Sequence, residues 1–137
     1  PIIKKLAEKL KKEQNWKIFA FNELISYSDK NFYLEGPEVF LSLINNASCV
    51  LANSFHAVAF SIIFKKDLAV FNRSDKINTR MRDLLQSVGL DHLLLLNEEM
   101  AMKYELDTLD FNEVQQKLDI HLERSKNFLK EALTKII

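Results

Sequence analysis

The sequence predicts an α/β fold, a doubly wound domain in which a parallel β-sheet is covered by helices on both faces. Two observations support this prediction. Short apolar runs of strand length, SCVLA at residues 48–52 and LAVF at residues 68–71, alternate with segments of helical periodicity. Strands that are apolar on both faces are typical of parallel sheets buried between helices, and alternating strands and helices are typical of βαβ units.

Composition restricts the class of protein. The chain has 137 residues, enough for one domain, with 19 basic and 19 acidic side chains and no net charge. A nucleic-acid-binding domain would normally carry a clustered basic excess. No apolar run reaches the ~18 residues that a membrane span needs. A lone cysteine, Cys49, excludes an internal disulfide and fits a reducing compartment, so we expect a cytoplasmic protein.

The first part of the chain is predicted to form a helix, a strand and a second helix. The apolar positions of the first helix recur at helical spacing: Ile3, Leu6, Ala7 and Leu10. Its lysine-rich face is a solvated surface or, alternatively, a membrane-facing one. Residues 16–21, WKIFAF, have strand composition. A polar stretch to Glu35 precedes Gly36-Pro37, and proline at a first helical position predicts a helix over PEVFLSLINN.

The middle of the chain pairs each apolar strand with a helix. Residues 53–64, NSFHAVAFSIIF, carry apolar side chains almost all round a helix, which predicts a buried helix. The strand at 68–71 is followed by a helix that Asn78 or Thr79 could cap and that Gly89 could end with a positive φ. Its apolar positions are Met81, Leu84, Leu85 and Val88.

The last part of the chain holds one further candidate strand and one long helix. LLLL at residues 93–96 is the fourth apolar run. Residues 110–136 read as a long helix, because Asp110 with Glu113 forms an N-terminal capping pattern and apolar residues follow at helical spacing.

The first helix has no strand before it. In a doubly wound fold, a helix normally returns from a preceding strand, so we expect a missing upstream strand. On this interpretation, residues 1–137 are one domain and the C-terminal fragment of a longer enzyme, with an unpaired sheet edge or apolar helix surface that favours self-association.

Three polar residues, Asn53, Ser54 and His56, come directly after the run at residues 48–52. Ligands of open α/β sheets bind outside the carboxyl ends of the strands, and the first-turn amides and dipole of a helix attract an anion. These residues therefore predict an anion site. The structural alternative is that Asn53 and Ser54 only cap the helix and that His56 is a satisfied interior histidine.

Two arginines follow the next strand, in NRSDKINTR at residues 72–80. Arg73 and Arg80 could reach the same edge of the sheet. Arg80 stands near a helix start, where the dipole disfavours a cation, which indicates a task such as gripping a carboxylate or phosphate with the planar guanidinium. The alternative is an ordinary surface arginine.

Four short motifs occur along the chain: GPEVF at residues 36–40, NSFH at 53–56, NTR at 78–80 and DF at 110–111. In this combination and spacing, the chain resembles the C-terminal region of the polysaccharide pyruvyl transferase family. That family shows a Gly-Pro-Glu-x-Phe helix start, an Asn-Ser-x-His-Gly turn, an Asn-x-Arg helix start and a final long helix after an Asp-aromatic pair. Ala57 replaces the glycine of the turn and leaves less room beside the backbone, and Asp67 replaces a common proline.

The resemblance implies a fold and a reaction. The fold is the Rossmann-like donor-side half of a two-domain, glycosyltransferase-B-like enzyme. The reaction moves the pyruvyl group of phosphoenolpyruvate onto two hydroxyls of a sugar as a ketal, and phosphate leaves. His56 would be the catalytic acid or base, or a contact to the donor phosphate. The donor-binding residues would be Asn53, Ser54, Asn78 and Arg80. The resemblance implies no metal and no cofactor beyond the donor substrate.

Two other functions remain open from the sequence. One is the nucleotide-sugar-binding half of a glycosyltransferase, and the other is a non-catalytic binding module, which Ala57 favours. The partners expected for the leading function are an acceptor saccharide, which can be lipid-linked, and the missing N-terminal domain. A peripheral position at the inner face of the membrane is compatible with such an acceptor.

Overall fold

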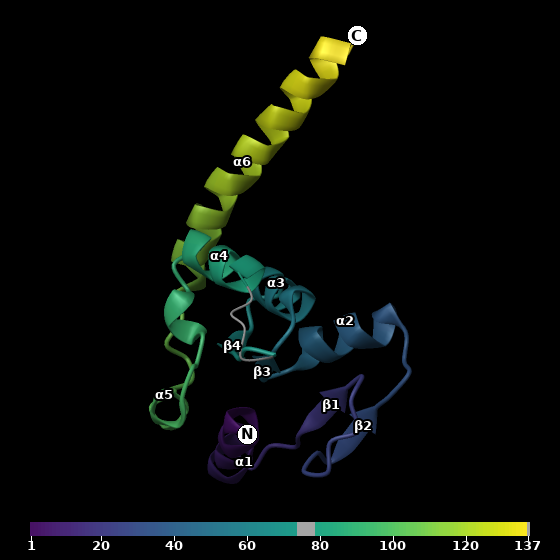
Figure 1. Ribbon diagram of the computed structural model, residues 1–137, viewed down its shortest axis with the longest axis vertical. Coiled ribbons are helices and arrows are strands. Elements are labelled where there is room, and N and C mark those ends of the chain that lie inside the picture. The colour runs from purple at the N-terminus through teal and green to yellow at the C-terminus, as the bar shows by residue number, and fades with distance from the viewer. Residues whose placement is uncertain (74–78, 137) are drawn as a thin grey trace.

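The computed structural model describes residues 1–73 and 79–136. The helices are α1 (Ile2–Gln14), α2 (Pro37–Asn46), α3 (Phe55–Ile63), α4 (Thr79–Ser87), α5 (Glu98–Met102) and α6 (Phe111–Ile136), and Asp91–Leu93 form a 3₁₀ turn. The strands are β1 (Phe19–Phe21), β2 (Lys30–Phe32), β3 (Cys49–Ala52) and β4 (Asp67–Val70) (Figure 1).

The four strands form two separate parallel pairs. β1 pairs with β2, and β3 pairs with β4 with Ala52 opposite Val70. A parallel bridge joins Val70 to Leu94 at the outer side of β4. The expectation of an α/β fold with parallel pairing is confirmed. The described residues do not, however, form the one continuous sheet that a doubly wound domain implies.

Two elements were absent from the sequence-based expectation. β2 lies in the polar stretch before Glu35, and its residues are exposed or half-buried. An edge strand of this kind needs no apolar pattern. The LLLL run forms the end of the 3₁₀ turn and the single bridge at Leu94 rather than a regular strand, and the short helix α5 follows it.

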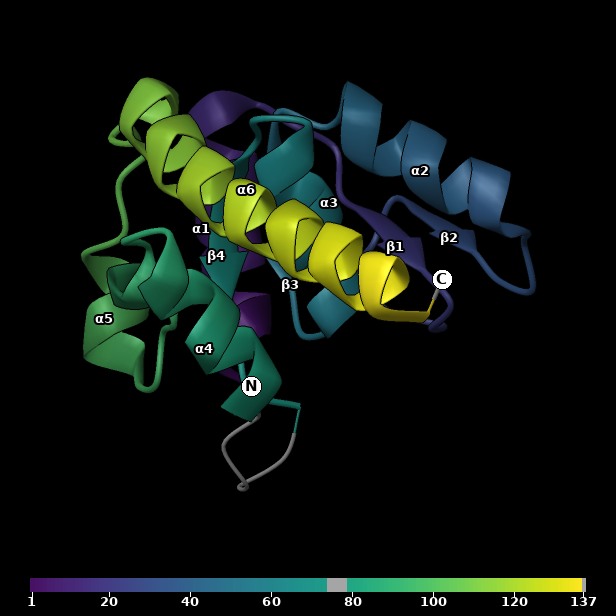
Figure 2. The same ribbon diagram turned by 90° about the horizontal axis from the view of Figure 1, so that it is seen from above.

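Helices cover both faces of the β3–β4 pair. α1 and α5 lie on one face, and α3 and α4 lie on the other (Figures 1 and 2). The core between these layers contains side chains from every one of these elements. Its most fully enclosed members are Leu6, Val58, Leu68, Val70, Met81, Leu85 and Val88. The predicted stripes of the first helix and of the helix before Gly89 are therefore confirmed as core positions.

α3 is less buried than its sequence predicts. Val58, Ser61 and Ile62 are buried, but Ile63 is 56% exposed. The buried hydroxyl of Ser61 donates to the carbonyl of Ala57 at 2.6 Å, so this polar side chain is satisfied inside the core. The expectation of a helix buried all round is wrong, because the structure covers only one side of α3 closely.

α6 begins as predicted and then leaves the core. The Oδ1 of Asp110 accepts from the amides of Asn112 and Glu113, at 3.0 and 3.3 Å. Val114 is the only buried residue of the described part of the helix. Leu118 still packs against the core, and the C-terminal part of the helix projects away from the other elements (Figure 1). Gly89 follows the C-terminal end of α4 and has a φ of 75°, the positive value that was predicted for a residue at this position.

These burial differences predict which apolar residues stabilise the fold. Leu85→Ala removes a fully enclosed side chain and should lower the free energy of unfolding by about 2–5 kcal/mol. Leu133→Ala, at a position that is 61% exposed on α6, is the matched control and should change it by less than about 0.5 kcal/mol. Urea denaturation measures both. Equal losses would show that α6 packs against the domain in solution.

Candidate active site

The pairing of β3 with β4 brings two polar segments to one edge. The amide of Phe71 donates to the carbonyl of Ala52 at 2.8 Å, so both strands end at the same level. Asn53 follows β3, and Asn72 follows β4. This is the carboxyl edge at which open α/β sheets bind ligands.

Ser54 is the N-cap of α3. Its backbone is extended, with φ −129° and ψ 147°, and its Oγ accepts from the amide of Ala57 at 3.3 Å. Such a cap contributes about 0.5–2 kcal/mol to the stability of the folded protein. Because the cap uses the amide of Ala57, the amides of Phe55 and His56 are the first-turn donors that point out of the helix end. Ser54 is therefore a capping residue, and the same geometry aims the positive end of the α3 dipole at the carboxyl edge.

His56 is exposed in the first turn of α3. Its ring packs edge-on against the ring of Phe55, with centroids 5.9 Å apart and planes at 85°. An exposed ring in this position is not a satisfied interior histidine. The imidazole is instead accessible to a ligand at the edge of the sheet.

Arg80 lies in the first turn of α4, on a different segment of the chain. Its guanidinium carbon is 4.6 Å from the centroid of the Phe55 ring, within the ~6 Å range of a cation–π contact. Phe55 therefore contacts both Arg80 and His56, and the two predicted site residues lie beside one aromatic ring. The attraction between the guanidinium and the Phe55 ring opposes the unfavourable interaction of this cation with the positive end of the α4 dipole.

Phe55 and Asn72 were not singled out by sequence reasoning. In the sequence, Phe55 is one of the apolar side chains of residues 53–64, although an aromatic residue between Ser54 and His56 is a usable signal. The Oδ1 of Asn72 is buried, and it has no hydrogen-bond partner among residues 1–73 and 79–136. Buried polar atoms are normally paired, so this acceptor is available to an N–H or O–H donor of a ligand at the same edge.

Three other residues of the predicted site make no described contact with the cluster of Phe55, His56 and Arg80. Asn53 is half-buried at the end of β3, and no side-chain hydrogen bond of this residue is among those described for residues 1–73 and 79–136. Asn78, predicted to bind the donor, lies outside the described residues. Arg73 is exposed just after β4.

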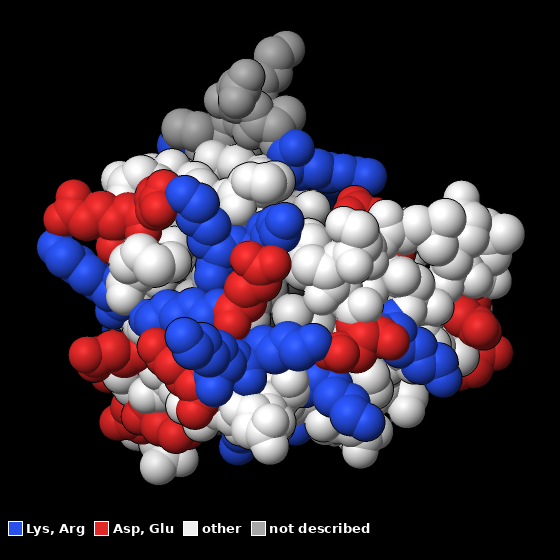
Figure 3. Space-filling model, turned by 90° about the horizontal axis from the view of Figure 1, so that it is seen from below, with Lys and Arg blue, Asp and Glu red and all other residues white. Residues whose placement is uncertain are grey.

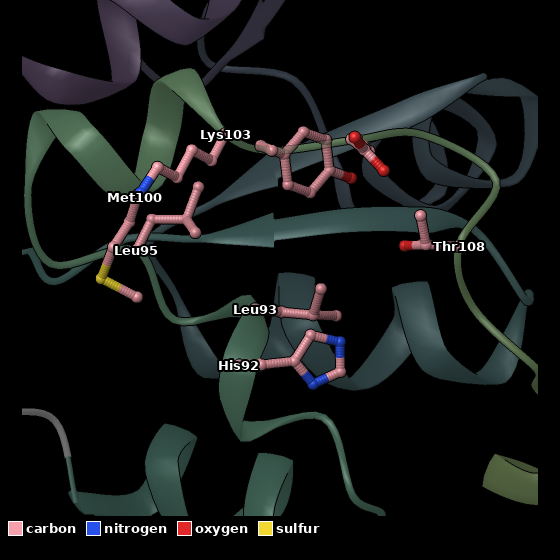
Figure 4. A pocket seen from close by; sticks show the side chains of 8 residues that line it. His92, Leu93, Leu95, Met100, Lys103 and Thr108 are labelled. Carbon is pink, nitrogen blue, oxygen red and sulfur yellow. The ribbon is translucent and has the colours of Figure 1, made fainter.

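Two shallow cavities occur elsewhere on the described surface. One, of about 310 Å³, is lined by side chains from the segments 92–95 and 100–108, with His92, Lys103 and Thr108 at its walls (Figure 4). The other, of about 510 Å³, lies between α1 and the segment after β1 and includes Trp16 and Tyr27. Neither is lined by His56 or Arg80.

The amino ends of β3 and β4 form a buried polar cluster. The hydroxyl of Tyr104, which lines the first cavity, lies 3.7 Å from the Sγ of Cys49. Burial raises the pKa of the Cys49 thiol to about 11 and also raises the pKa of Tyr104. Burial likewise raises the pKa of Asp67, whose carboxylate accepts from the amide of Asp107 at 3.2 Å. A protonated thiol on a half-buried cysteine of an apolar strand is a packing residue rather than a nucleophile.

The lysines of α1 are interleaved with acidic side chains. Lys5 pairs with Glu98 at 2.6 Å, and Lys11 pairs with Asp29 at 2.7 Å. The hydrogen bond from Lys11 is the largest cause of the lowered pKa of Asp29. Figure 3 shows acidic and basic side chains mixed over this face. This mixture of charges agrees with the interpretation of the lysine-rich face of α1 as a surface exposed to solvent.

In the described part of the chain, no helix combines the length and the apolarity that crossing a bilayer requires.

Comparison with known proteins identifies one family. The family model described as Polysaccharide pyruvyl transferase matches residues 2–75, which is just over half of the 137 residues. The matched region contains GPEVF and NSFH, whereas NTR at 78–80 and DF at 110–111 lie beyond it. Searches of the curated proteins and of the solved structures find no match.

The environment of Cys49 predicts slow thiol chemistry. At pH 8, a thiol with a pKa of about 11 has roughly a hundredfold less thiolate than an ordinary cysteine, and burial slows its reaction further. Alkylation by iodoacetamide, followed by mass spectrometry, should be at least about a hundredfold slower in the folded chain than in urea. Equal rates in the two states would contradict the raised pKa and the partial burial of the Cys49 thiol.

Proposed function

Because the chain belongs to the polysaccharide pyruvyl transferase family, we propose that it is the donor-side domain of an enzyme that transfers the pyruvyl group of phosphoenolpyruvate to a saccharide. The observation that carries this proposal is the cluster of His56, Phe55 and Arg80 beside the N-terminus of α3. An imidazole, a guanidinium and helix-end amides are three groups that bind or act on a phosphorylated carboxylic acid.

The donor is a small anion with a carboxylate and a phosphate. Arg80 offers a planar pair of donors that fits either group. The amides of Phe55 and His56, with the α3 dipole, bind the other. Ser54 orders this helix end through its cap, and Asn53 and Asn78 are donor-binding residues of the same edge. Phe55 positions the guanidinium.

The reaction moves two protons and one phosphate. The methylene carbon of phosphoenolpyruvate gains a proton and becomes a methyl group, while a first sugar hydroxyl bonds to the central carbon and loses its proton. Phosphate then leaves with the bridging oxygen. A second hydroxyl completes the ketal, and its proton is transferred to the departing phosphate. His56 is placed to give and take protons in these steps, and Arg80 stabilises the charge on the departing phosphate.

The rest of the enzyme supplies the acceptor side. We propose a Rossmann-like domain within a two-domain, glycosyltransferase-B-like protein that works in the cytoplasm, with an acceptor that can be lipid-linked. The exposed apolar side chains of α6 support a contact with another domain or another copy. They include Leu122, Phe128, Leu129 and Leu133. On this account, residues 1–137 alone carry out no transfer and need no metal.

His56→Ala tests the catalytic part of the proposal in the full-length enzyme. Loss of the imidazole should lower kcat for pyruvyl transfer by about 10²–10⁴-fold. Because His56 is exposed, the melting temperature should stay nearly unchanged. His121→Ala, at an exposed histidine of α6, is the control and should leave kcat unaltered. Unchanged transfer by His56→Ala would exclude the assigned role.

Arg80→Lys tests the donor site. Lysine keeps the charge but loses both the planar pair of donors and the contact of the guanidinium with the Phe55 ring. We therefore expect the Kd for phosphoenolpyruvate to rise at least about tenfold. Arg124→Lys, at an exposed arginine of α6, serves as the matched control. Titration calorimetry of the full-length enzyme measures both. Binding of a nucleotide sugar, with no binding of phosphoenolpyruvate, would favour the glycosyltransferase alternative instead.

A further inference from the structure

The larger of the two cavities lies apart from the candidate active site. It encloses about 510 Å³ between the second half of α1 and the segment that joins β1 to β2, a size typical of small-molecule sites. We call it the Trp16–Tyr27 cavity. Its lining side chains are Glu8, Lys11, Lys12, Asn15, Trp16 and Tyr27. None of these residues belongs to the cluster beside the N-terminus of α3.

Asp29 holds the two walls of this cavity together. Its Oδ1 accepts from the Nζ of Lys11 on α1 at 2.7 Å, and its Oδ2 accepts from the amide of Ile18 at 2.7 Å. The hydroxyl of Ser28 donates to the carbonyl of Ile25 at 2.9 Å, which fixes the segment before β2. The walls are therefore ordered before a ligand arrives, and this order lowers the entropic cost of binding.

Two half-buried aromatic side chains supply the apolar part of the lining. Asn15 ends α1 in the left-handed conformation, with φ 55°, and the amide of Trp16 then donates to the carbonyl of Lys11 at 3.2 Å. Trp16 packs against the core and also lines the cavity. Burial raises the pKa of Tyr27, so its hydroxyl stays protonated and remains a donor. Neither this hydroxyl nor the indole N–H of Trp16 forms a hydrogen bond with the described residues.

The charges around the cavity favour an uncharged ligand. α1 ends here, so the negative end of its dipole opposes an anion, and the carboxylate of Glu8 does the same. The ammonium groups of Lys11 and Lys12 oppose a cation. Two of the charges are already paired, because Lys11 contacts Asp29 at 2.7 Å and Glu8 lies 3.9 Å from Lys4. The lining therefore offers hydrogen-bonding groups of both kinds without a strong excess of either charge.

We propose that the Trp16–Tyr27 cavity binds an uncharged saccharide. A sugar ring has a face of C–H groups, which the aromatic side chains bury. Its hydroxyls both donate and accept, and they match the amide of Asn15, the carboxylate of Glu8 and the free indole N–H. The inference rests on this cavity alone and is independent of the reaction assigned to the carboxyl edge. Where the proposed function holds, the cavity binds a sugar unit of the acceptor other than the one that reacts.

An NMR titration of the full-length enzyme tests this inference. The probes are neutral trisaccharides of glucose, of galactose and of N-acetylglucosamine, added in the absence of phosphoenolpyruvate. The indole N–H signal of Trp16, identified by its loss in Trp16→Phe, should shift saturably with at least one probe. A trisaccharide that contains a uronic acid should bind no more tightly, because the negative end of the α1 dipole opposes its carboxylate.

Two variants separate binding from folding. Asn15→Gly removes the amide side chain but keeps the turn, because glycine adopts a positive φ without strain, and it should raise the Kd for the saccharide at least about threefold. Tyr27→Ala removes one aromatic ring and should raise this Kd at least about tenfold. Tyr33→Ala, at a tyrosine that is 50% exposed and outside the cavity, is the matched control and should leave it unchanged. None of the three variants should alter the Kd for phosphoenolpyruvate, so failure here is distinct from failure of the proposed function.

Three results would overturn the proposal. No saturable shift of the Trp16 signal with any neutral probe would show that the cavity does not bind saccharides. Tighter binding of the probe with a uronic acid would assign the cavity to an anion. Saccharide binding that Arg80→Lys weakens and Tyr27→Ala does not would place the sugar at the carboxyl edge instead.

Discussion

The structure depends on the parallel ladder between β3 and β4. This ladder fixes the level at which the two strands end and so places Asn53 and Asn72 at one edge. Leu68, Ala69 and Val70 of β4 are at most 1% exposed, because helices cover both faces of the pair. The polar residues that follow each strand are consequently held by a rigid core, as a binding site requires.

The candidate site follows from this arrangement together with one aromatic ring. α3 begins shortly after β3, and α4 is the next helix after β4. The contact between Phe55 and Arg80 shows that the first turns of these two helices are neighbours. Phe55 lies where it contacts His56 of its own helix and Arg80 of the next one. The ring brings a titratable group and a permanent cation together without an ion pair between them. No hydrogen bond or ion pair joins either side chain to another described residue, so both can bind a ligand through hydrogen bonds.

Sequence reasoning recovered what local chemistry determines. The helix starts at Pro37 and Ser54, the positive φ of Gly89 and the cap at Asp110 each depend on a few neighbouring residues. β2 was missed because an exposed edge strand has no apolar pattern. The exposure of α3 was missed because it depends on which elements cover it. The contact of Arg80 with Phe55 joins residues far apart in the chain, so neither residue's own segment predicted it.

The candidate active site and the Trp16–Tyr27 cavity are two separate features of the domain. The first lies where β3 ends, and the second lies beside the residues that precede β1 and β2. The positive end of the α3 dipole points to the first and the negative end of the α1 dipole to the second, so helix dipoles favour an anion only at the first. The raised pKa of Cys49 belongs to neither, because Cys49 lies at the amino end of β3.

A crystal structure of the full-length transferase with phosphoenolpyruvate tests the central claim most directly. The account predicts that one anionic group of the donor accepts from the amides of Phe55 and His56, while the other accepts from Arg80. The imidazole of His56 should then face the methylene carbon or the bridging oxygen. A donor bound in the cavity beside Tyr104, or at any site without Arg80 and His56, would contradict it.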